Sequence, residues 1–300
     1  MTDGRATDGG LDAIDVHQHL SHDSLRREHQ RLHVERNVVF EGPRRSTSPP
    51  DPAERGRAEL ANRLAALDEE SVRGAVIIPI HGYLRPEGIR DTALMNDAVA
   101  EYRALAPHRF VAAVGVVEPI HGPAGYPEIE RCRDEHGFVG ISLHGQVATH
   151  SLLMKRLVGR IGEAGMVPFV HAYGTYTETL AQVESVAHDF PELPMLVLDA
   201  FHDRTQAALV PEVAQRCPNL HFDLSSAVGF EVLGLPQVRR VGAHRFLYGS
   251  NMHSLPLNTR PLGRLRQAIL DSDLPVDDKA KILSGNARRL LGLPDGRPDS

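Results

Sequence analysis

The sequence of 300 residues is poor in cysteine and in aromatic residues, and its 33 Lys and Arg are outnumbered by 39 Asp and Glu. It has two cysteines, Cys132 and Cys217, no tryptophan, and 5% aromatic residues in all. Two cysteines exclude a disulfide framework or a CxxC metal knuckle, and few aromatic rings disfavour a surface that stacks nucleic-acid bases. The net charge of −6 argues further against nonspecific binding of nucleic acid.

Long apolar runs are also absent. No run approaches the ~20 residues that a membrane-spanning helix needs, and the first ten residues lack the basic and apolar regions of a signal peptide. We therefore expect a soluble, cytoplasmic protein without membrane contact. The chain does have 41% hydrophobic and 24% charged residues, the balance of a globular domain. It also has 17 histidines, whose positions carry most of the functional argument.

Short apolar runs rich in β-branched residues recur along the whole chain, and eight of them are predicted strands. They have the continuous apolar character of buried parallel strands. Their ranges are Leu11–His17, Gly74–Ile80, Phe110–Val117, Phe138–Leu143, Met166–His171, Met195–Ala200, Leu220–Leu224 and Arg245–Gly249.

Helical patterns alternate with these strands. They cover Ala53–Ser71, Asp91–Ala106, Tyr126–His136, Ser151–Ala164, Thr177–His188, Gln206–Arg216, Phe230–Val241, Leu262–Asp271 and Asp277–Leu291. Eight strand-then-helix units predict an α/β fold, a single-domain (β/α)₈ TIM barrel. A doubly wound sheet is the alternative, but the segment after the first strand, HQHLSHD, lacks the glycines of a phosphate-binding turn.

The barrel is expected over residues 11–293, between tails at 1–10 and 294–300. The connection over residues 19–52 is far longer than the two to six residues usual after a barrel strand. It is rich in arginine and also holds apolar residues such as Val38, Val39 and Phe40. This mixture favours a lid over the site, and a disordered insert is the alternative.

Histidines lie at the carboxyl ends of the predicted strands, where a barrel builds its active site. His17 and His19 are two residues apart at the end of the first strand, so their side chains share a face. His171 ends the fifth strand. Converging imidazoles suit Zn²⁺, Fe²⁺ or Mn²⁺. The sequence therefore predicts a divalent metal, zinc in the first place, held by His17, His19 and His171.

Further polar residues follow other predicted strands. His202 follows the sixth strand, and Asn251 and His253 follow the eighth. A second group is predicted to bind substrate. It comprises two histidines of the rim, a tyrosine that can donate to a carbonyl, and two lid arginines that can clamp a carboxylate through paired hydrogen bonds: His81, His144, Tyr173, Arg44 and Arg45.

Several motifs resemble the amidohydrolase superfamily and, within it, the amidohydrolase-2 branch. That branch contains aminocarboxymuconate-semialdehyde decarboxylase, related aromatic-acid decarboxylases, hydratases and metal-independent lactonases. The resemblance covers nearly the whole chain and implies the same barrel fold. The motifs are the DxHxH opening at Asp15–His19, GFVGISL at Gly137–Leu143, Pro168–His171, NLHFDLS at Asn219–Ser225, Gly249–Asn251, and GNARRLLGL at Gly285–Leu293.

The sequence departs from the family pattern at two catalytic positions. The family's strand-eight aspartate binds metal and acts as the general base, but this chain has Asn251, whose amide can offer a carbonyl and cannot take a proton. The family's strand-six histidine falls near Ala200, and the nearest histidine here is His202. We expect His202 or His253 to replace the base, because imidazole titrates near neutral pH, and Asn251 to be a weak ligand or to orient substrate.

These expectations combine into one function and three alternatives. The predicted function is metal-assisted hydrolysis of a C–N or C–O bond in a small carboxylated molecule, with a bound water as the nucleophile. A lyase or decarboxylase and a metal-independent, lactonase-like enzyme are alternatives on the same barrel. A catalytically inactive barrel that binds a ligand is the third. The expected partner is a small-molecule substrate, and a homo-oligomer is compatible with the sequence. Substrate identity is set by loops and not by the barrel.

Overall fold

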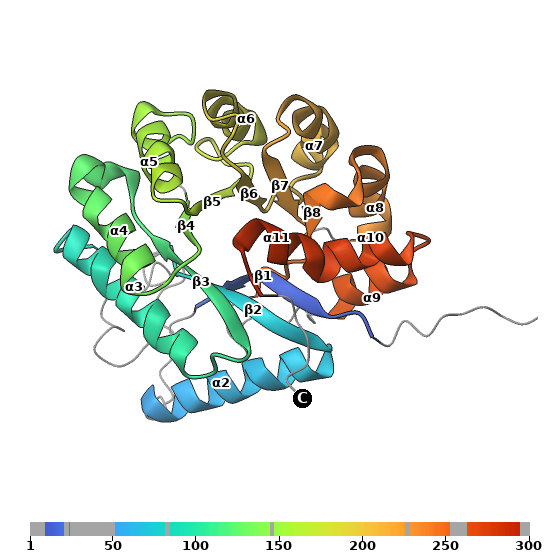
Figure 1. The fold of residues 1–300 in the computed structure, drawn as a ribbon, viewed down its shortest axis with the longest axis horizontal. Helices are drawn as coiled ribbons and strands as arrows, with labels where there is room; N and C mark the ends of the chain where they lie inside the picture. The colour runs from blue at the N-terminus through green and yellow to red at the C-terminus, as the bar shows by residue number, and fades with distance from the viewer. Residues whose placement is uncertain are drawn as a thin grey trace, which may run out of the picture.

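The structure is a computed structural model that describes residues 10–20, 24, 52–81, 85–144, 147–225, 229–252 and 263–294. Eight strands pair in parallel in chain order (Figure 1). Beyond the last strand, Val16 N donates to Tyr248 O at 3.1 Å and Met252 N donates to His17 O at 3.2 Å. These bonds bring the end of the sheet back to its start. The fold is the nearly closed (β/α)₈ barrel that the sequence predicted. Its strands are β1 (Ala13–His19), β2 (Val72–Ile78), β3 (Phe110–Val116), β4 (Gly140–Leu143), β5 (Val167–His171), β6 (Met195–Leu198), β7 (Leu220–Asp223) and β8 (Phe246–Leu247).

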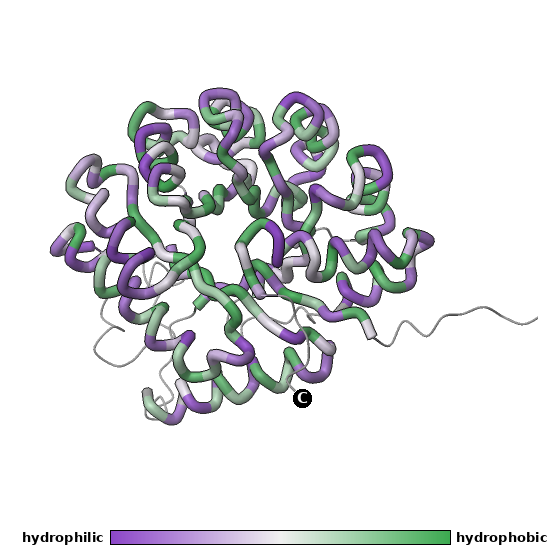
Figure 2. Tube along the Cα trace, viewed as in Figure 1, coloured by the Kyte–Doolittle hydropathy of each residue, from purple (hydrophilic) through white to green (hydrophobic). Residues whose placement is uncertain are grey.

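Helices surround the strands, and hydrophilic and hydrophobic residues alternate along these outer helices in Figure 2. None of the helices in the described part of the chain is long and apolar enough to cross a membrane. The helices are α2 (Pro52–Glu69), α3 (Ile89–Ala104), α4 (Tyr126–Asp134), α5 (Leu152–Glu163), α6 (Leu180–Asp189), α7 (Arg204–Arg216), α8 (Phe230–Val241), α9 (Gly263–Asp271), α10 (Val276–Ala280) and α11 (Asn286–Leu291), with short 3₁₀ segments η3 (Pro119–Gly125) and η4 (Ala243–Arg245) and a π-helical turn η5 (Lys281–Gly285).

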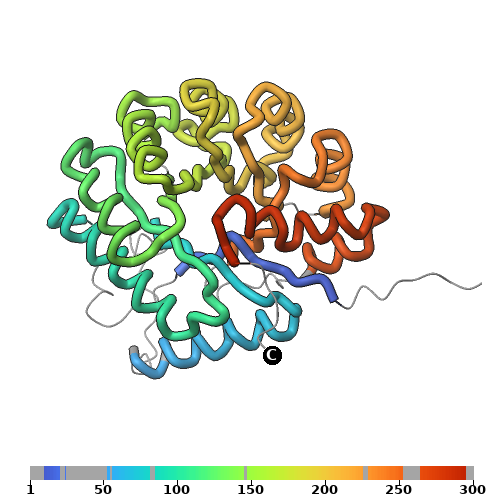
Figure 3. The backbone as a smooth tube through the Cα atoms, in the orientation of Figure 1, coloured from blue at the N-terminus to red at the C-terminus, as the bar shows by residue number. Residues whose placement is uncertain are grey.

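The amino end of the barrel is closed by the end of the chain. Interior residues such as Ile14, Phe169 and Leu196 form one apolar cluster with Ala287 and Leu291 of α11. Figure 1 shows α11 across the centre of the barrel, and Figure 3 shows the red C-terminal segment beside the blue first strand. A larger apolar cluster packs the outside of the strands against the helices.

Several boundaries differ from those expected. β1 begins and ends two residues later than predicted, so His17 and His19 both lie within the strand. β8 has two residues where five were expected. α6 begins at Leu180 and not at Thr177, because Thr179 caps it and forms a reciprocal pair of hydrogen bonds with Gln182. The predicted last helix continues through α10, η5 and α11, with its middle turn π-helical.

The pairing of β1 with β2 is interrupted between Asp15 and Gln18. An irregularity of this kind re-aims the side chains that follow it. Val16 belongs to the apolar interior. In a regular strand, His17 and His19 would point to the opposite side from Val16, yet both also reach the interior and face β5. The bulge thus changes the lining of the barrel from apolar to imidazole within one strand. The predicted tails and lid, 1–10, 294–300 and 19–52, lie outside the described residues except for a few residues at their edges.

Candidate active site

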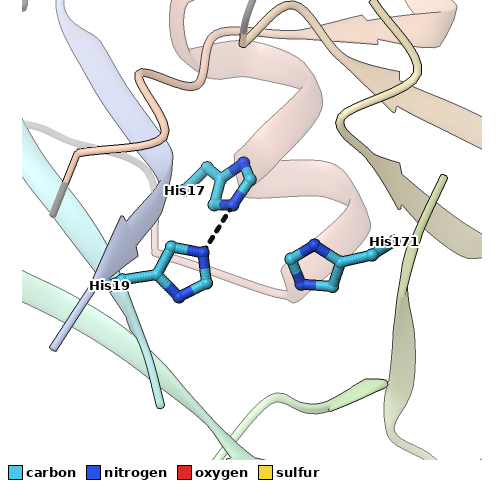
Figure 4. A group of neighbouring side chains, drawn as sticks. All are labelled: His17, His19 and His171. Atoms are coloured by element: carbon cyan, nitrogen blue, oxygen red, sulfur yellow. Dashed lines mark hydrogen bonds between the residues drawn. The ribbon is translucent and has the colours of Figure 1, made fainter. Parts of the chain in front are cut away.

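Three imidazoles meet inside the carboxyl end of the barrel (Figure 4). His17 and His19 come from β1, and His171 is the last residue of β5. All three are buried, and one ring nitrogen of each lies within 4.8 Å of the other two. The structure therefore brings together the three histidines that the sequence singled out as metal ligands.

Each of these imidazoles is held through its Nδ1 by an oxygen. A carboxylate or a carbonyl can only accept a hydrogen bond, so Nδ1 carries the hydrogen and Nε2 keeps its lone pair. Metal-bound histidines are typically oriented in this way. The Nδ1 pairs are His17 with Asp223 Oδ2 at 2.7 Å, His19 with Pro79 O at 3.1 Å, and His171 with Asp199 Oδ2 at 3.0 Å.

The Nε2 atoms of His17 and His19 lie 3.0 Å apart, as the dashed line in Figure 4 marks. With both Nδ1 atoms protonated, this contact needs a positive centre between the two Nε2 atoms, either a proton that makes one ring an imidazolium or a metal ion. Two nitrogens bound to one ion at about 2.1 Å each lie roughly 3.0–3.4 Å apart, for ligand angles between about 90° and the tetrahedral value. The geometry of this pair therefore fits a divalent cation.

Asn251 adds an oxygen to this arrangement. Its Nδ2 donates to Asp199 Oδ1 at 2.8 Å. Its buried Oδ1 has no hydrogen-bond partner among the described residues, which leaves it available to a cation or a substrate. Asp199 and Asn251 both have a positive φ, 62° and 54°, in the left-handed region that Asp and Asn tolerate better than most residues. Backbone strain of this kind is typical of functional positions.

Asp223, at the end of β7, links two of the elements that form the site. Its Oδ2 holds His17, and its Oδ1 accepts the backbone N–H of Asp199 at 3.1 Å. The segment that follows β8 comes close to Asp223 and His17 at Gly249. A Cβ at Gly249 would lie 2.8 Å from Asp223 Oδ2 and 3.1 Å from His17 Cβ. Glycine is therefore required at position 249 for the carboxylate to reach its imidazole.

Asp15, the acid of the DxHxH motif, accepts the backbone N–H of His17 at 3.0 Å, but among the described residues it forms no hydrogen bond to an imidazole ring. It accepts hydrogen bonds from Ser250 N at 2.9 Å, Ser250 Oγ at 2.5 Å and Gln18 Nε2 at 2.8 Å. Burial raises the pKa of the Asp15 carboxyl, and these hydrogen bonds oppose that rise. Asp15 therefore ties β1 to the segment after β8 and positions the backbone beside Asn251.

The pKa shifts of the histidines differ in direction: that of His17 is upward, and those of His171 and His81 are downward. Burial alone lowers the pKa of His17, but the charges of Asp223 and Asp199 outweigh burial, so the net direction is upward. Burial lowers the pKa of His171 and holds that of His81 well below its usual value, with the neighbouring imidazoles adding to the effect. Burial works against ionisation of Asp199, yet His17 and His171 bring its pKa below the ordinary value.

A second group extends the cluster toward solvent. Ser142 Oγ lies 2.8 Å from His81 Nε2 and 3.3 Å from His171 Nε2, so it bridges β2 and β5. The ring of His144 is 4.7 Å from that of His171, its Nδ1 lies 2.5 Å from Glu178 Oε1, and its side chain is 30% exposed. Of the five residues predicted to bind substrate, His81 and His144 thus border the three buried imidazoles.

The remaining predicted site residues lie elsewhere. His202 is exposed and its ring stacks on that of Tyr173, with the centroids 3.9 Å apart. Neither ring forms a hydrogen bond to the imidazole cluster among the described residues. His253, Arg44 and Arg45 lie outside the described residues.

Sequence reasoning missed two residues of the site. At strand six, where the sequence pointed to Ala200 or His202, the residue that reaches the cluster is Asp199, and Ala200 packs in the outer apolar core. The available signal was Asp199, an acid next to the end of the buried run MLVLDA. Glu178 lies in the connection before α6. It had no local signal, because its partner His144 is 34 residues away.

Comparison with known proteins places the chain in a family. The amidohydrolase family model matches residues 14–293, so the chain belongs to the amidohydrolase-2 family. This is a family of enzymes whose members are typically metal-dependent, and the three histidines form a site of matching type. No curated protein matches the chain at a significant level.

Solved structures share the fold. The chain resembles 5-carboxyvanillate decarboxylase from Sphingomonas paucimobilis with a TM-score of 0.70 and 18% identity, over 95% of this chain and 100% of that one. It resembles 4-oxalomesaconate hydratase from Rhodopseudomonas palustris with a TM-score of 0.67 and 19% identity, over 93% and 95%. For a probable 2-pyrone-4,6-dicarboxylic acid hydrolase from Acinetobacter baumannii the TM-score is 0.58 and the identity 14%, over 94% and 99%.

Proposed function

We propose that this protein is a metal-dependent hydrolase that cleaves a C–N or C–O bond in a small carboxylated molecule. The observation that carries the proposal is the set of three buried imidazoles whose Nδ1 atoms are all held by acceptors, with two Nε2 atoms 3.0 Å apart. His17, His19 and His171 would hold a divalent cation, zinc in the first place, through Nε2. Asn251 Oδ1 would be a neutral fourth donor. A cation bound there supplies Lewis acidity and a water of lowered pKa.

The residues around these ligands have separable tasks. Asp223 and Asp199 keep the hydrogens on Nδ1 of His17 and His171 and fix the two rings. Asn251 lacks the proton affinity of a carboxylate, so another group must move the proton. We assign this role to His144, whose Nδ1 is fixed by Glu178 and whose ring stands between the buried cluster and solvent.

His202 and His253 are the candidates that the sequence proposed for the same role. The exposed stacking of His202 on Tyr173 makes it the weaker candidate for moving a proton within the cluster. His144→Gln should lower kcat by roughly 10²–10⁴-fold if His144 moves the proton. His202→Gln is the matched comparison and should then leave kcat within a few-fold of the native value. A large loss in His202→Gln with a small one in His144→Gln would reverse the assignment.

The substrate class is supported by the names of the similar structures. They are a decarboxylase of a carboxyvanillate, a hydratase of oxalomesaconate and a probable hydrolase of a pyrone dicarboxylic acid, all of which are carboxylated. A carboxylate needs cationic donors, and Arg44 and Arg45 are our candidates from the sequence. A bidentate contact contributes about 1.5–3 kcal/mol. Arg44→Ala with Arg45→Ala should therefore raise KM for the substrate roughly 10–100-fold, and unchanged kinetics would reject the clamp.

Decarboxylation is the second candidate, because two of the similar structures are decarboxylases, of 5-carboxyvanillate and of 2,6-dihydroxybenzoate. The same His144 could then deliver a proton to carbon. A panel of lactones, amides and aromatic acids, assayed in ¹⁸O-labelled water, separates the two reactions. Hydrolysis places ¹⁸O in the organic product and releases no CO₂, whereas decarboxylation releases CO₂.

Metal analysis of the purified protein tests the proposal as a whole. We expect up to one divalent ion per chain at this site and turnover that falls on chelation. Turnover that persists without metal would support the metal-independent, lactonase-like alternative. Ligand binding with no turnover across the panel, despite bound metal, would support the catalytically inactive barrel.

A further inference from the structure

Three side chains of metal-ligand type meet on the outside of the barrel, where α6 packs beside the end of α7. Glu184 and His188 are four residues apart on α6, which places them on the same face of the helix. Cys217 directly follows the last residue of α7. One ligand atom of each lies within 4.8 Å of the other two. Cys217 Sγ is 3.8 Å from His188 Nε2, and that nitrogen is 3.6 Å from Glu184 Oε1.

These separations are close to those that one ion imposes on its ligands. Zinc binds a thiolate at about 2.3 Å and imidazole or carboxylate at about 2.0–2.2 Å, so two tetrahedral ligands lie roughly 3.3–3.6 Å apart. A contraction of a few tenths of an ångström would bring the Sγ–Nε2 and Nε2–Oε1 pairs to this spacing. The thiol and the carboxylate, whose ligand atoms lie within 4.8 Å of each other, would close around the same ion. One sulfur, one nitrogen and one oxygen form a donor set that suits a borderline-soft divalent cation.

The backbone around the three ligands is fixed. Asn219 Nδ2 donates to the carbonyl oxygens of Phe190 and Leu193 at 2.9 and 3.1 Å, which ties the segment after α6 to the loop before β7. The carbonyl of Cys217 accepts Arg245 Nη2 at 2.7 Å. The thiol of Cys217 is therefore presented from an anchored position, while the His188 side chain, 54% exposed, leaves a path for an ion from solvent.

We propose that Glu184, His188 and Cys217 form a second, outer binding site for Zn²⁺, with its fourth position open to water. Binding transfers the proton of the Cys217 thiol to solvent and leaves the thiolate on the ion. This site is independent of the reaction proposed for the barrel. Its ligands join α6 to α7, so an ion bound there would hold these two outer helices together.

Arg216 sets the expected strength of this outer site. Its guanidinium contacts both oxygens of Glu184, with Nη2 3.0 Å from Oε2. An ion on Oε1 would share the carboxylate with this positive charge, and like charges close together weaken binding. Arg216→Gln should therefore tighten Zn²⁺ binding several-fold.

Cobalt distinguishes the outer site from the inner one. The three histidines in the barrel include no thiol, whereas Co²⁺ bound to Cys217 gives a thiolate-to-cobalt charge-transfer band in the near ultraviolet. Titration of the metal-free, full-length protein with Co²⁺ should produce this band, which should saturate when the outer site holds one ion in addition to the one that the inner site takes up. Zn²⁺ should then displace the cobalt and remove the band. A titration without the band would overturn the proposal.

The chain offers a matched control, because Cys132 is its only other cysteine. Cys217→Ser should abolish the band, and Cys132→Ser, in α4, should retain it. His188→Gln, at an exposed position that folding tolerates, should weaken Co²⁺ binding at least tenfold and carries the test if Cys217→Ser does not fold. A band that survives Cys217→Ser, or an affinity unchanged in His188→Gln, would show that these side chains are not the ligands.

Discussion

The two ends of the barrel are built from the same strands, but one end buries apolar side chains and the other buries polar ones. At the amino end the interior is apolar, from Ile14 on β1 to Leu291 on α11. At the carboxyl end the same strands present imidazoles and carboxylates that are equally buried. Buried polar groups are costly unless they are hydrogen-bonded, and here each of the three imidazoles is held by an oxygen through its Nδ1. His17, Asp223 and Asp199 form one continuous chain of contacts.

This difference separates the two kinds of effect that substitutions should have. Apolar packing at the amino end contributes stability without chemistry, as is general for barrels. The hydrogen-bonded network at the carboxyl end orients ligand atoms, and a change in one member is transmitted to the next. Substitutions at the carboxyl end should therefore change metal binding and turnover most, and substitutions at the amino end should change stability alone.

The largest effect is expected from removing two of the three inner ligands. His17→Ala with His19→Ala should reduce the metal content at the inner site from near one per chain to near zero. Turnover should fall by more than the 10–100-fold that is typical when a residue hydrogen-bonded to a metal ligand is lost. Metal analysis after dialysis and steady-state kinetics measure both effects.

His108→Ala with His150→Ala, two exposed histidines away from the site, is the matched control for this double variant and should keep both metal and turnover. If the double variant of His17 and His19 keeps its metal and activity, the inner metal site does not exist.

The next largest effect concerns Asp199 and Asn251. Asp199→Asn removes the carboxylate that holds His171 Nδ1 and should cost 10–100-fold in metal affinity or activity. Asn251→Asp should also weaken the site, although a carboxylate is the better metal ligand. The new carboxylate would replace the donor that lies 2.8 Å from Asp199 Oδ1, and the two like charges would repel.

The reciprocal exchange tests this pair directly. Asp199→Asn combined with Asn251→Asp restores one amide and one carboxylate, with the roles reversed. The double variant should lose less than the sum of the single losses, with a coupling of about 1 kcal/mol or more. Asp134→Asn, at an exposed acid of α4, controls for the change of charge. Simple additivity would mean that the two side chains do not interact.

The apolar pattern of the strands was sufficient to predict the fold. The positions of His17, His19 and His171 followed because a barrel builds its active site at the carboxyl ends of its strands. What the sequence could not supply is the set of partners that hold those rings. Asp199 reaches His171 because its backbone adopts a positive φ, and no strand pattern predicts that conformation. Glu178 meets His144 through a loop, and loop conformation is set by tertiary contacts. The bulge in β1 likewise follows from pairing with β2 and not from the sequence of β1 alone.

A smaller effect on turnover is expected from the close approach of β8. The added Cβ of Gly249→Ala would lie 2.8 Å from Asp223 Oδ2 and should displace the carboxylate from His17, at a cost of about 1–3 kcal/mol in stability and a loss of metal affinity. Gly285→Ala is the matched control, because the nearest atom to its added Cβ is Ala280 O at 3.5 Å, an ordinary contact. Equal metal affinity in both variants would show that Gly249 is not needed for the site.

The smallest effect on turnover, close to none, is expected from His221 at the amino half of β7, where the effect should fall on stability instead. Burial, followed by the charges of Arg245, Arg289 and His244, lowers the pKa of His221 to about 4 from 6.5. Between these two values the unfolded chain binds a proton that the folded chain does not, so stability is complete above pH 6.5 and declines as the pH falls toward 4. At pH 5 the loss from this group is about 2 kcal/mol.

His221→Gln removes the titrating group, so the difference in unfolding free energy between pH 7 and pH 5 should shrink by about that amount. Chemical denaturation at the two pH values measures this change, with His150→Gln, at an exposed turn, expected to keep the native acid sensitivity. Metal content and turnover at pH 7 should be unchanged in His221→Gln, because the residue lies at the amino half of β7, in the part of the barrel that contributes stability alone. A loss of metal in this variant would mean that the two ends of the barrel are coupled, and the contrast between them would fail.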